Sequence, residues 1–446
     1  MEFYSGTHES FFDEEQNTPK SPTPLSFKTH HQLNISEIDK ECSSPRPLSP
    51  IDQLPPQSPE SPWTLSPLHP SPSLLFQCLT SLYRHDGNIF SIAVLRDLVF
   101  TGSESSRIRV WRKPECMERG YIKAKSGEVR ALSAYANMLF STHRDHRIRV
   151  WSISLSDKFR SKKITSLPRR NSFLLFPRSK FQQHHKDCIS CLAYYHAEGI
   201  LYTGSWDKTV KAWRMSDRKC VDSFMAHEDH INGIVVNQED GCVFTCSSDG
   251  SVKIWRRVFG ESSHTLTMTL KFQLSPVNAL ALSRSPDASF LYSGSSDGFI
   301  NVWEKEKVSG RFNHGGFLHG HRFSVLCLEA IDGLVLSGSE DTTVRVWKRE
   351  EGTSFHACLA VLDGHRGPVK CLAACLEMDT LAMGFLVHTA SLDGTFKIWR
   401  VKVFSSETKL TMKLDDADTN DQKKKRAEYE ICPVLSPAWV EKKRQG

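Results

Sequence analysis

The chain has 446 residues and a formal net charge of +6, so it is long enough for more than one domain and only weakly basic. A bias this small does not indicate nucleic-acid binding, because nucleic-acid binders concentrate Lys and Arg on one face. The first ten residues, MEFYSGTHES, lack the basic and apolar regions of a signal peptide, and no apolar run is long enough to cross a bilayer. We therefore expect no transmembrane segment and a location in the cytoplasm, the nucleus or both.

Residues 1–73 are rich in Ser and contain 13 of the 21 prolines. Such a segment buries too little apolar surface to offset the entropy of ordering it, so we expect a disordered tail. Phosphorylation by proline-directed kinases would add about two negative charges per site. The candidate serines, each followed by Pro, are Ser21, Ser44, Ser49, Ser58, Ser61, Ser66 and Ser71. A soluble spacer without modification is the alternative.

A repeat follows, and its seven units end in Trp111, Trp151, Trp213, Trp255, Trp303, Trp347 and Trp399. Ten residues before each Trp stands Ser or Thr, and six residues before it stands Asp in every unit except the first, which has Ser105. The third unit predicts four strands, at Ile189–Tyr195, Ile200–Ser205, Thr209–Arg214 and Lys219–Met225. Four short strands per unit are typical of a β-propeller blade.

The blocks YTGSWDKTVKAW, FTCSSDGSVKIW, LSGSEDTTVRVW and HTASLDGTFKIW resemble WD repeats. The resemblance implies an all-β fold in which residues 74–403 form a seven-bladed propeller, flanked by disordered tails at 1–73 and 404–446. It also implies that residues 76–83 close the ring by joining the blade that ends at Trp399. The Ser-Pro-rich leader, the segment LTSLYRHDGNIFSIAV and a basic insert after the second repeat are similar to plant JINGUBANG-like WD-repeat proteins, which implies a regulator of plant development, such as of pollen or growth.

Four units combine His, Ser or Thr, Asp and Trp at fixed spacing. The sets are His185, Thr203, Asp207 and Trp213; His227, Thr245, Asp249 and Trp255; His321, Ser337, Asp341 and Trp347; and His365, Thr389, Asp393 and Trp399. The residue types match a hydrolase triad, but a nucleophile is needed once and in a cleft, not four times around a ring. The WD-repeat resemblance implies a buried structural network instead, so we predict no enzyme activity. The first, second and fifth units lack part of this set, and we expect softer blades there.

A candidate partner-binding face follows from the same resemblance. In WD-repeat proteins the residue before the turn Asp projects from a face that often binds peptides. The residues at this position are Glu104, Arg144, Trp206, Ser248, Ser296, Glu340 and Leu392. Trp and Arg dominate binding hot spots, which favours Trp206 and Arg144. The alternative is a ring of ordinary solvated turn residues.

Two basic segments lie outside the repeat pattern. The insert at residues 156–182 carries eight Lys and Arg residues against the single acid Asp157. We expect part of it to form an outer strand and the rest to be a loop that contacts phosphates of lipid or nucleic acid, or stays solvated. Its Arg169-Arg170-Asn171-Ser172 run makes Ser172 a candidate for basophilic kinases. In the tail at 404–446, Lys423, Lys424, Lys425 and Arg426 are a candidate nuclear import signal.

The thirteen cysteines include three close pairs, Cys188/Cys191, Cys242/Cys246 and Cys371/Cys375. All lie on or beside predicted strands, where residues three or four apart do not converge on one ion, so we expect no metal and no cofactor. The predicted function is a scaffold or regulatory adaptor that binds other proteins, such as a transcription regulator or a kinase, and has no small-molecule substrate. A substrate receptor of a cullin-type ubiquitin ligase is the alternative, although no repeat ends in Trp-Asp-x-Arg.

Overall fold

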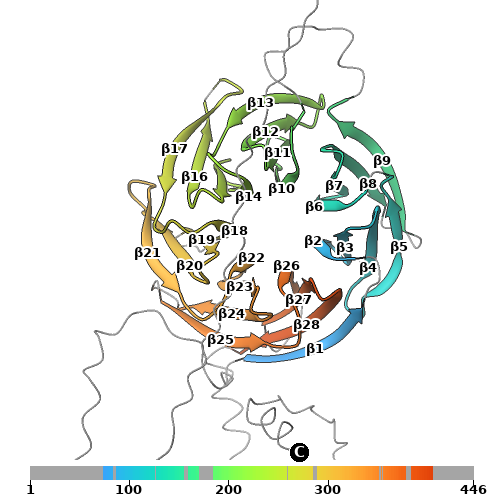
Figure 1. The fold of residues 1–446 in the computed structure, drawn as a ribbon, viewed down its shortest axis with the longest axis vertical. Coiled ribbons are helices and arrows are strands. Elements are labelled where there is room, and N and C mark those ends of the chain that lie inside the picture. The colour runs from blue at the N-terminus through green and yellow to red at the C-terminus, as the bar shows by residue number, and fades with distance from the viewer. Residues whose placement is uncertain are drawn as a thin grey trace, which may run out of the picture. The chain divides into compact units, whose positions relative to one another are not determined.

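The computed structural model describes residues 74–83, 87–125, 127–154, 159–169, 184–258, 260–284, 289–350, 353, 355–377 and 383–404. These residues form seven four-stranded antiparallel sheets that are arranged as blades around a common axis (Figure 1). The predicted all-β, seven-bladed propeller is therefore confirmed. Outside the described residues lie Ser172, the seven candidate phosphoserines Ser21, Ser44, Ser49, Ser58, Ser61, Ser66 and Ser71, and the candidate import signal Lys423, Lys424, Lys425 and Arg426.

Blades 1 to 6 share one plan, in which four consecutive strands run from the axis to the rim (Figure 1). Blade 1 contains β2 (Ile89–Leu95), β3 (Leu98–Ser103), β4 (Arg107–Arg112) and β5 (Met117–Lys123). Blade 2 contains β6 (Val129–Tyr135), β7 (Met138–His143), β8 (Ile148–Ser154) and β9 (Arg160–Leu167). Blade 3 contains β10 (Ile189–Tyr195), β11 (Ile200–Ser205), β12 (Thr209–Arg214) and β13 (Lys219–Met225), which confirms the four strands predicted for this unit.

The next three blades continue the same order around the ring. Blade 4 contains β14 (Ile231–Val236), β15 (Val243–Ser247), β16 (Val252–Arg257) and β17 (His264–Leu270). Blade 5 contains β18 (Val277–Arg284), β19 (Ser289–Ser295), β20 (Ile300–Lys305) and β21 (Phe312–Leu318). Blade 6 contains β22 (Val325–Ile331), β23 (Leu334–Ser339), β24 (Val344–Arg349) and β25 (His356–Leu362).

Blade 7 is built from both ends of the described chain. Its inner strands are β26 (Val369–Glu377), β27 (Met383–Ser391) and β28 (Thr395–Val403), and its outer strand is β1 (Leu74–Tyr83). β1 pairs antiparallel with β28 from Leu74 opposite Val403 to Tyr83 opposite Thr395. The predicted closing strand is therefore confirmed. This pairing completes the last blade and closes the ring.

The core lies between neighbouring blades. Tyr202 and Val210 of blade 3, for example, belong to the same buried cluster as Ile231 and Trp255 of blade 4. The last blade packs on the first in the same way, with Phe396 of blade 7 against Trp111 of blade 1 at 5.7 Å between ring centroids. Because each blade buries apolar side chains against the next, the ring stabilises itself as a whole.

Candidate functional site

In blade 3 the four predicted residues form one chain of hydrogen bonds. Nδ1 of His185 lies 2.9 Å from Oδ2 of Asp207, and Nε2 lies 2.8 Å from Oγ1 of Thr203. The indole N–H of Trp213 donates to the same Thr203 oxygen at 3.0 Å. Asp207 also accepts from the backbone N–H of Lys186 at 2.8 Å, so the network ties the loop before β10 to the turn between β11 and β12.

The network is satisfied when the imidazole of His185 is neutral. Its Nδ1–H then donates to Asp207, its Nε2 accepts from the Thr203 hydroxyl, and the Thr203 oxygen still accepts from Trp213. Burial lowers the pKa of His185, which favours this neutral form. Burial alone would raise the pKa of Asp207, but hydrogen bonds from His185 and Thr209 hold it below its usual value. The carboxylate therefore stays charged and anchors the turn.

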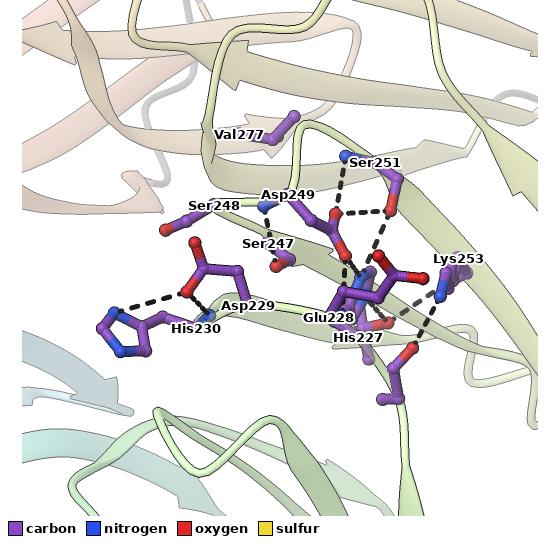
Figure 2. A network of polar contacts seen from close by, with 12 residues as sticks. His227, Glu228, Asp229, His230, Ser247, Ser248, Asp249, Ser251, Lys253 and Val277 are labelled. Carbon is purple, nitrogen blue, oxygen red and sulfur yellow. Dashed lines mark hydrogen bonds and ion pairs between the residues drawn. The ribbon is translucent and has the colours of Figure 1, made fainter.

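Blades 4 and 6 repeat this geometry. In blade 4, shown in Figure 2, His227 contacts Asp249 at 2.9 Å and Thr245 at 2.8 Å, and Ser251 donates to Asp249 at 2.6 Å. In blade 6 the corresponding distances from His321 are 2.8 Å to Asp341 and 2.7 Å to Ser337. Trp255 and Trp347 donate to Thr245 and Ser337 at 3.0 and 2.9 Å.

Blade 7 varies the pattern. His365 still contacts Thr389 at 2.7 Å, and Trp399 donates to that same oxygen at 2.9 Å. Its Nδ1, however, lies 2.8 Å from the hydroxyl of Thr395 and 3.7 Å from Asp393. Asp393 reaches the loop through the backbone N–H of Arg366 at 2.7 Å. Burial lowers the pKa of His365 to about 4 despite the nearby carboxylate.

Although these bonds follow the order of a hydrolase triad, none of the four hydroxyl groups can act as a nucleophile on a bound substrate. Thr203, Thr245, Ser337 and Thr389 each have 0% of their surface exposed. Each hydroxyl oxygen already receives the indole N–H of its blade's Trp. The arrangement thus serves to join loop, turn and strands, because a fully satisfied buried network rigidifies the structure around it.

Among the residues that the structure describes, blades 1, 2 and 5 have no His–Asp contact of this kind, each for a different reason. In blade 1, Ser105 takes the place of the Asp and bonds Ser103 at 3.0 Å. In blade 5, Asp297 accepts from the backbone N–H of Phe299 at 3.0 Å, and Leu274-Ser275-Pro276 stands where the His would be.

Blade 2 contains a substitute that the sequence pattern did not reveal. His143, two residues before Asp145, lies 2.8 Å from Ser141, the residue to which Trp151 donates. Asp145 instead pairs with Arg149 at 2.6 Å. A histidine therefore completes the buried end of this blade from β7 rather than from the loop, and burial lowers its pKa to about 3.

The seven predicted face residues share one backbone hydrogen bond. Each donates its N–H to the carbonyl of the residue directly before the innermost strand of its blade: Glu104 to Asn88 (3.1 Å), Arg144 to Glu128 (3.3 Å), Trp206 to Cys188 (2.9 Å), Ser248 to His230 (3.0 Å), Ser296 to Pro276 (2.9 Å), Glu340 to Ser324 (2.9 Å) and Leu392 to Pro368 (2.9 Å). Because the bond is the same in every blade, these residues lie at one end of the propeller, which we call the turn face.

The seven side chains differ in how available they are. Arg144, Glu340 and Leu392 are exposed, and so is Glu104, which accepts a hydrogen bond from Asn88 at 2.9 Å. Ser248 and Ser296 are half-buried and accept hydrogen bonds at 3.0 Å from Asn232 and Asn278, whose amides also bond the next blade. These two serines therefore belong to the frame rather than to a free surface.

Trp206 is half-buried and has aromatic and cationic neighbours. Its ring stacks on His230 at 5.4 Å and 23°, and the guanidinium of Arg130 lies 5.8 Å from its centroid. Arg130 also lies 4.6 Å from the ring of Phe90 and pairs with Glu128 at 2.8 Å. We call Phe90, Arg130, Trp206 and His230 the aromatic–arginine row; it runs across blades 1 to 3 to the loop before blade 4.

Sequence reasoning missed three members of this row. Phe90 and Arg130 are the second residues of β2 and β6, and both stand at a register shift between the first two strands of their blades. The same position carries Ser190, Asn232 and Asn278 in blades 3 to 5. Comparing this position across the repeats would have shown that blades 1 and 2 place an aromatic ring and a guanidinium where blades 3 to 5 have small polar residues and blades 6 and 7 have Leu326 and Lys370.

The basic insert and the cysteine pairs are the remaining candidates from the sequence. β9 forms the outer strand of blade 2, as expected for part of the basic insert, and exposes Arg160, Lys162 and Lys163. The described members of the cysteine pairs are free thiols, and no group of three or more possible metal ligands occurs within the described ranges. The part of the chain that the structure describes contains no helix long and apolar enough to cross a membrane.

Comparison with known proteins finds several partial relatives. The chain is 28% identical over 129 residues to an uncharacterized WD repeat-containing protein of Schizosaccharomyces pombe, covering 29% of this chain and 34% of that protein. It is 26% identical over 233 residues to an F-box/WD-40 repeat-containing protein of Arabidopsis thaliana, covering 51% and 39%. It is 25% identical over 156 residues to pre-mRNA-processing factor 19 of Bos taurus, covering 34% and 27%. The chain thus spans well under half the length of each of these relatives.

The family model described as WD domain, G-beta repeat matches residues 76–112, 176–214, 218–256, 264–304, 313–348 and 356–400, which together make up more than half of the chain. The unmatched stretch between the first two segments contains blade 2, where Arg149 and His143 replace the usual contacts. Both the matched segments and the seven blades lead to the same assignment. The chain belongs to the WD-repeat family.

Proposed function

We propose that the protein is a non-enzymatic adaptor that binds a segment of another protein on its turn face. The observation that carries the proposal is the aromatic–arginine row. Trp206 and His230 offer stacked ring surface next to a guanidinium, and aromatic and Arg side chains contribute most to binding energy at protein interfaces. Exposed Arg144 extends this surface on blade 2.

The four-part networks support the proposal by supplying rigidity. A binding surface costs less to order when its backbone is fixed before the partner arrives. In blade 3 the turn that carries Trp206 is held by Asp207 and His185 directly beneath it. The row therefore stands on one of the best-connected turns of the ring, which suits a docking site.

For the cellular role we propose regulation in a plant signalling or developmental pathway, in the cytoplasm, the nucleus or both. The similarity of the leader, the first strand segment and the basic insert to JINGUBANG-like proteins supports it. Among the proposed partners, a kinase would fit the candidate phosphorylation sites of the leader. A transcription regulator would fit a location in the nucleus. The candidate import signal Lys423, Lys424, Lys425 and Arg426 supports nuclear access.

A substrate receptor of a cullin-type ubiquitin ligase is the second candidate. The similarity to the F-box/WD-40 repeat-containing protein of Arabidopsis thaliana favours it. Against it, none of the seven repeat-ending Trp residues begins a Trp-Asp-x-Arg sequence. The adaptor is the better-supported function, because its evidence comes from the turn face and does not require a ligase-binding sequence.

Affinity purification with mass spectrometry tests the proposal by comparing the intact protein with Trp206→Ala/Arg144→Glu. A matched control, Tyr121→Ala/Lys123→Glu, makes the same kinds of change on exposed positions of β5 at the rim. We expect a defined set of partners to fall about tenfold or more with the first variant and to persist with the control. Equal recovery with all three proteins would contradict the turn-face assignment. Recovery of a cullin and its adaptor would favour the ligase function instead.

A further inference from the structure

A pocket of about 520 Å³ opens between three adjacent blades. Most of its lining residues belong to β14, β18 and β22. These are the innermost strands of blades 4, 5 and 6, which are neighbours in the ring (Figure 1). This volume lies within the range of protein sites that hold small molecules. The wall combines polar side chains such as Gln238 and Ser283 with the apolar side chains of Val236, Leu282 and Ile331.

The pocket lies at the end of the propeller opposite the turn face. Each innermost strand begins beside a turn-face residue, as the bonds from Ser248, Ser296 and Glu340 show. The lining residues instead come from the second half of each strand and, in blade 6, from the following turn at Asp332. A ligand in this pocket would therefore not compete with one on the turn face.

Glu329 is the unusual residue of this pocket. It is the fifth residue of β22 and pairs with Leu336 of β23. The equivalent positions, defined by the same pairing in the other blades, carry Ala93, Ser133, Ala193, Val235, Ala281 and Ala373. Six small or apolar residues show that the propeller frame does not require a carboxylate here.

The carboxylate of Glu329 has no partner within the described structure. No hydrogen bond or ion pair reaches it from a described side chain, although it lines the open pocket. Burial raises its pKa to about 7, because the surrounding protein disfavours the charged form. A carboxylate in such a position is unfavourable for folding unless a cation or a donor satisfies it.

We propose that this pocket binds the ammonium or guanidinium group of a Lys or Arg side chain that a partner protein inserts, with Glu329 as its counter-ion. The apolar walls at Val236, Leu282 and Ile331 would pack against the aliphatic stem, as the stems of these two residues pack on apolar surface elsewhere. The carboxylate would accept charge-assisted hydrogen bonds from the head group. The protein would then have a second docking point, on the opposite end from the turn face.

Ligand-observed saturation-transfer NMR at pH 8 tests the proposal with three acetylated and amidated peptides. Each has the sequence Gly-Ser-Gly-X-Gly-Ser-Gly, where X is Arg, Lys or citrulline, the neutral isostere of Arg. We expect the Arg and Lys peptides to bind at millimolar or lower concentration and the citrulline peptide to bind at least about tenfold more weakly. Equal affinity for all three, or no binding at 10 mM (roughly the weakest affinity of interest), would overturn the proposal.

Two substitutions separate binding from folding. Glu329→Gln keeps the shape of the side chain, and Glu329→Ala supplies the residue that four other blades have at this position. Both substitutions should lower the affinity for the Arg peptide about tenfold or more. The melting temperature of Glu329→Ala should be unchanged or higher. A lower melting temperature for Glu329→Ala would assign Glu329 a structural role and overturn the proposal. Glu306→Gln, at the exposed turn between β20 and β21, removes a carboxylate that does not line the pocket. It is the matched control and should change affinity by less than about threefold.

The turn-face variant keeps the two sites distinguishable. Trp206→Ala/Arg144→Glu should bind the Arg peptide as the intact protein does, because its changes lie at the other end of the blades. Loss of peptide binding in that variant would overturn the location proposed for this pocket site while leaving the turn-face proposal standing.

Discussion

Blades 3, 4 and 6 connect His, Asp and a buried hydroxyl to the repeat's Trp, whereas blades 1, 2 and 5 connect only part of this set. The bond from the Trp indole to Ser or Thr is nevertheless present in all seven, at 2.8 to 3.0 Å. The two groups of blades therefore differ near the turn face and agree near the Trp. The buried Trp bond is therefore common to every blade, while the His–Asp extension fixes the loop and turn above it in some of them.

Blade 7 stands between the two groups, since its His365 reaches Asp393 through Thr395. Its outer strand, the ten-residue β1 along β28, comes from a distant part of the chain, whereas the outer strand of every other blade follows directly in sequence. Lys397 of β28 also donates to Ser81 of β1 at 2.6 Å. Blade 7 thus depends on pairing between distant parts of the chain as well as on its own network.

The largest effect should come from removing that support. Deletion of residues 74–83 exposes the edge of β28, so we expect the melting temperature to fall by about 10 °C or more, or the protein to aggregate through the free edge. Differential scanning calorimetry together with size-exclusion chromatography measures both outcomes. Deletion of residues 1–73 is the control and should leave the melting temperature within about 2 °C. An unchanged melting temperature after deletion of 74–83 would contradict closure by β1.

A smaller effect should separate the two groups of blades. Asp207→Ala in blade 3 leaves His185 and the backbone N–H of Lys186 without their acceptor, and we expect it to lower the free energy of unfolding by about 2–4 kcal/mol. Asp297→Ala removes the bond from Phe299 in blade 5 and should cost about 0.5–1.5 kcal/mol. Urea denaturation of both variants measures these losses of free energy of unfolding. Equal losses in the two variants would contradict the expected difference between the two groups of blades.

Amide hydrogen exchange on the unmodified protein gives an independent check of the same comparison. The turns and inner strands of blades 1, 2 and 5 should exchange before those of blades 3, 4 and 6. Uniform protection in all seven blades would show that the missing His–Asp contact has no effect on local stability. In blade 2, the contact of His143 with Ser141 is expected to slow exchange, so that this blade differs less from blades 3, 4 and 6 than blades 1 and 5 do.

The smallest effect concerns pH and blade 7. Burial lowers the pKa of His388 to about 4, below its value of about 6.5 in the unfolded chain. The unfolded chain therefore binds more protons between these values, so stability is constant above about pH 6.5 and falls as the pH decreases towards 4. His388→Phe supplies the residue that blades 1, 2 and 4 have at this position and should reduce the loss between pH 7 and 5 by about 1–2 kcal/mol. If urea denaturation gave His388→Phe the same pH dependence of the free energy of unfolding as the intact protein, the prediction would be wrong.

The repeat pattern allowed the fold to be predicted almost completely. Fixed spacing between hydroxyl, Asp and Trp identified seven blades, and alternation within the third repeat placed its four strands at their observed limits. These features depend on neighbours within a single blade, which is why local sequence reports them. The closing strand needed the family resemblance, since nothing local pairs residues 74–83 with 395–403.

The candidate site could be predicted only in part. Sequence spacing placed Trp206 at a turn, but its neighbours Arg130 and Phe90 come from two other blades, and local patterns do not report contacts between repeats. Glu329 was visible in the sequence yet gave no signal by itself. Its meaning depends on the strand register that aligns it with six small or apolar residues and on the pocket beside it.

Closure by β1 also has a kinetic consequence. Ser81 and Lys397 are 316 residues apart in the chain, yet they are hydrogen-bond partners. At synthesis rates of about 5–20 residues per second, β1 exists for roughly 15–60 s before the strand it pairs with has been made. Six blades are complete by then, and each can form from consecutive strands. Completion of the ring is therefore the last step available to the nascent chain, and a ribosome that stops shortly before β28 releases a product with an unpaired first strand.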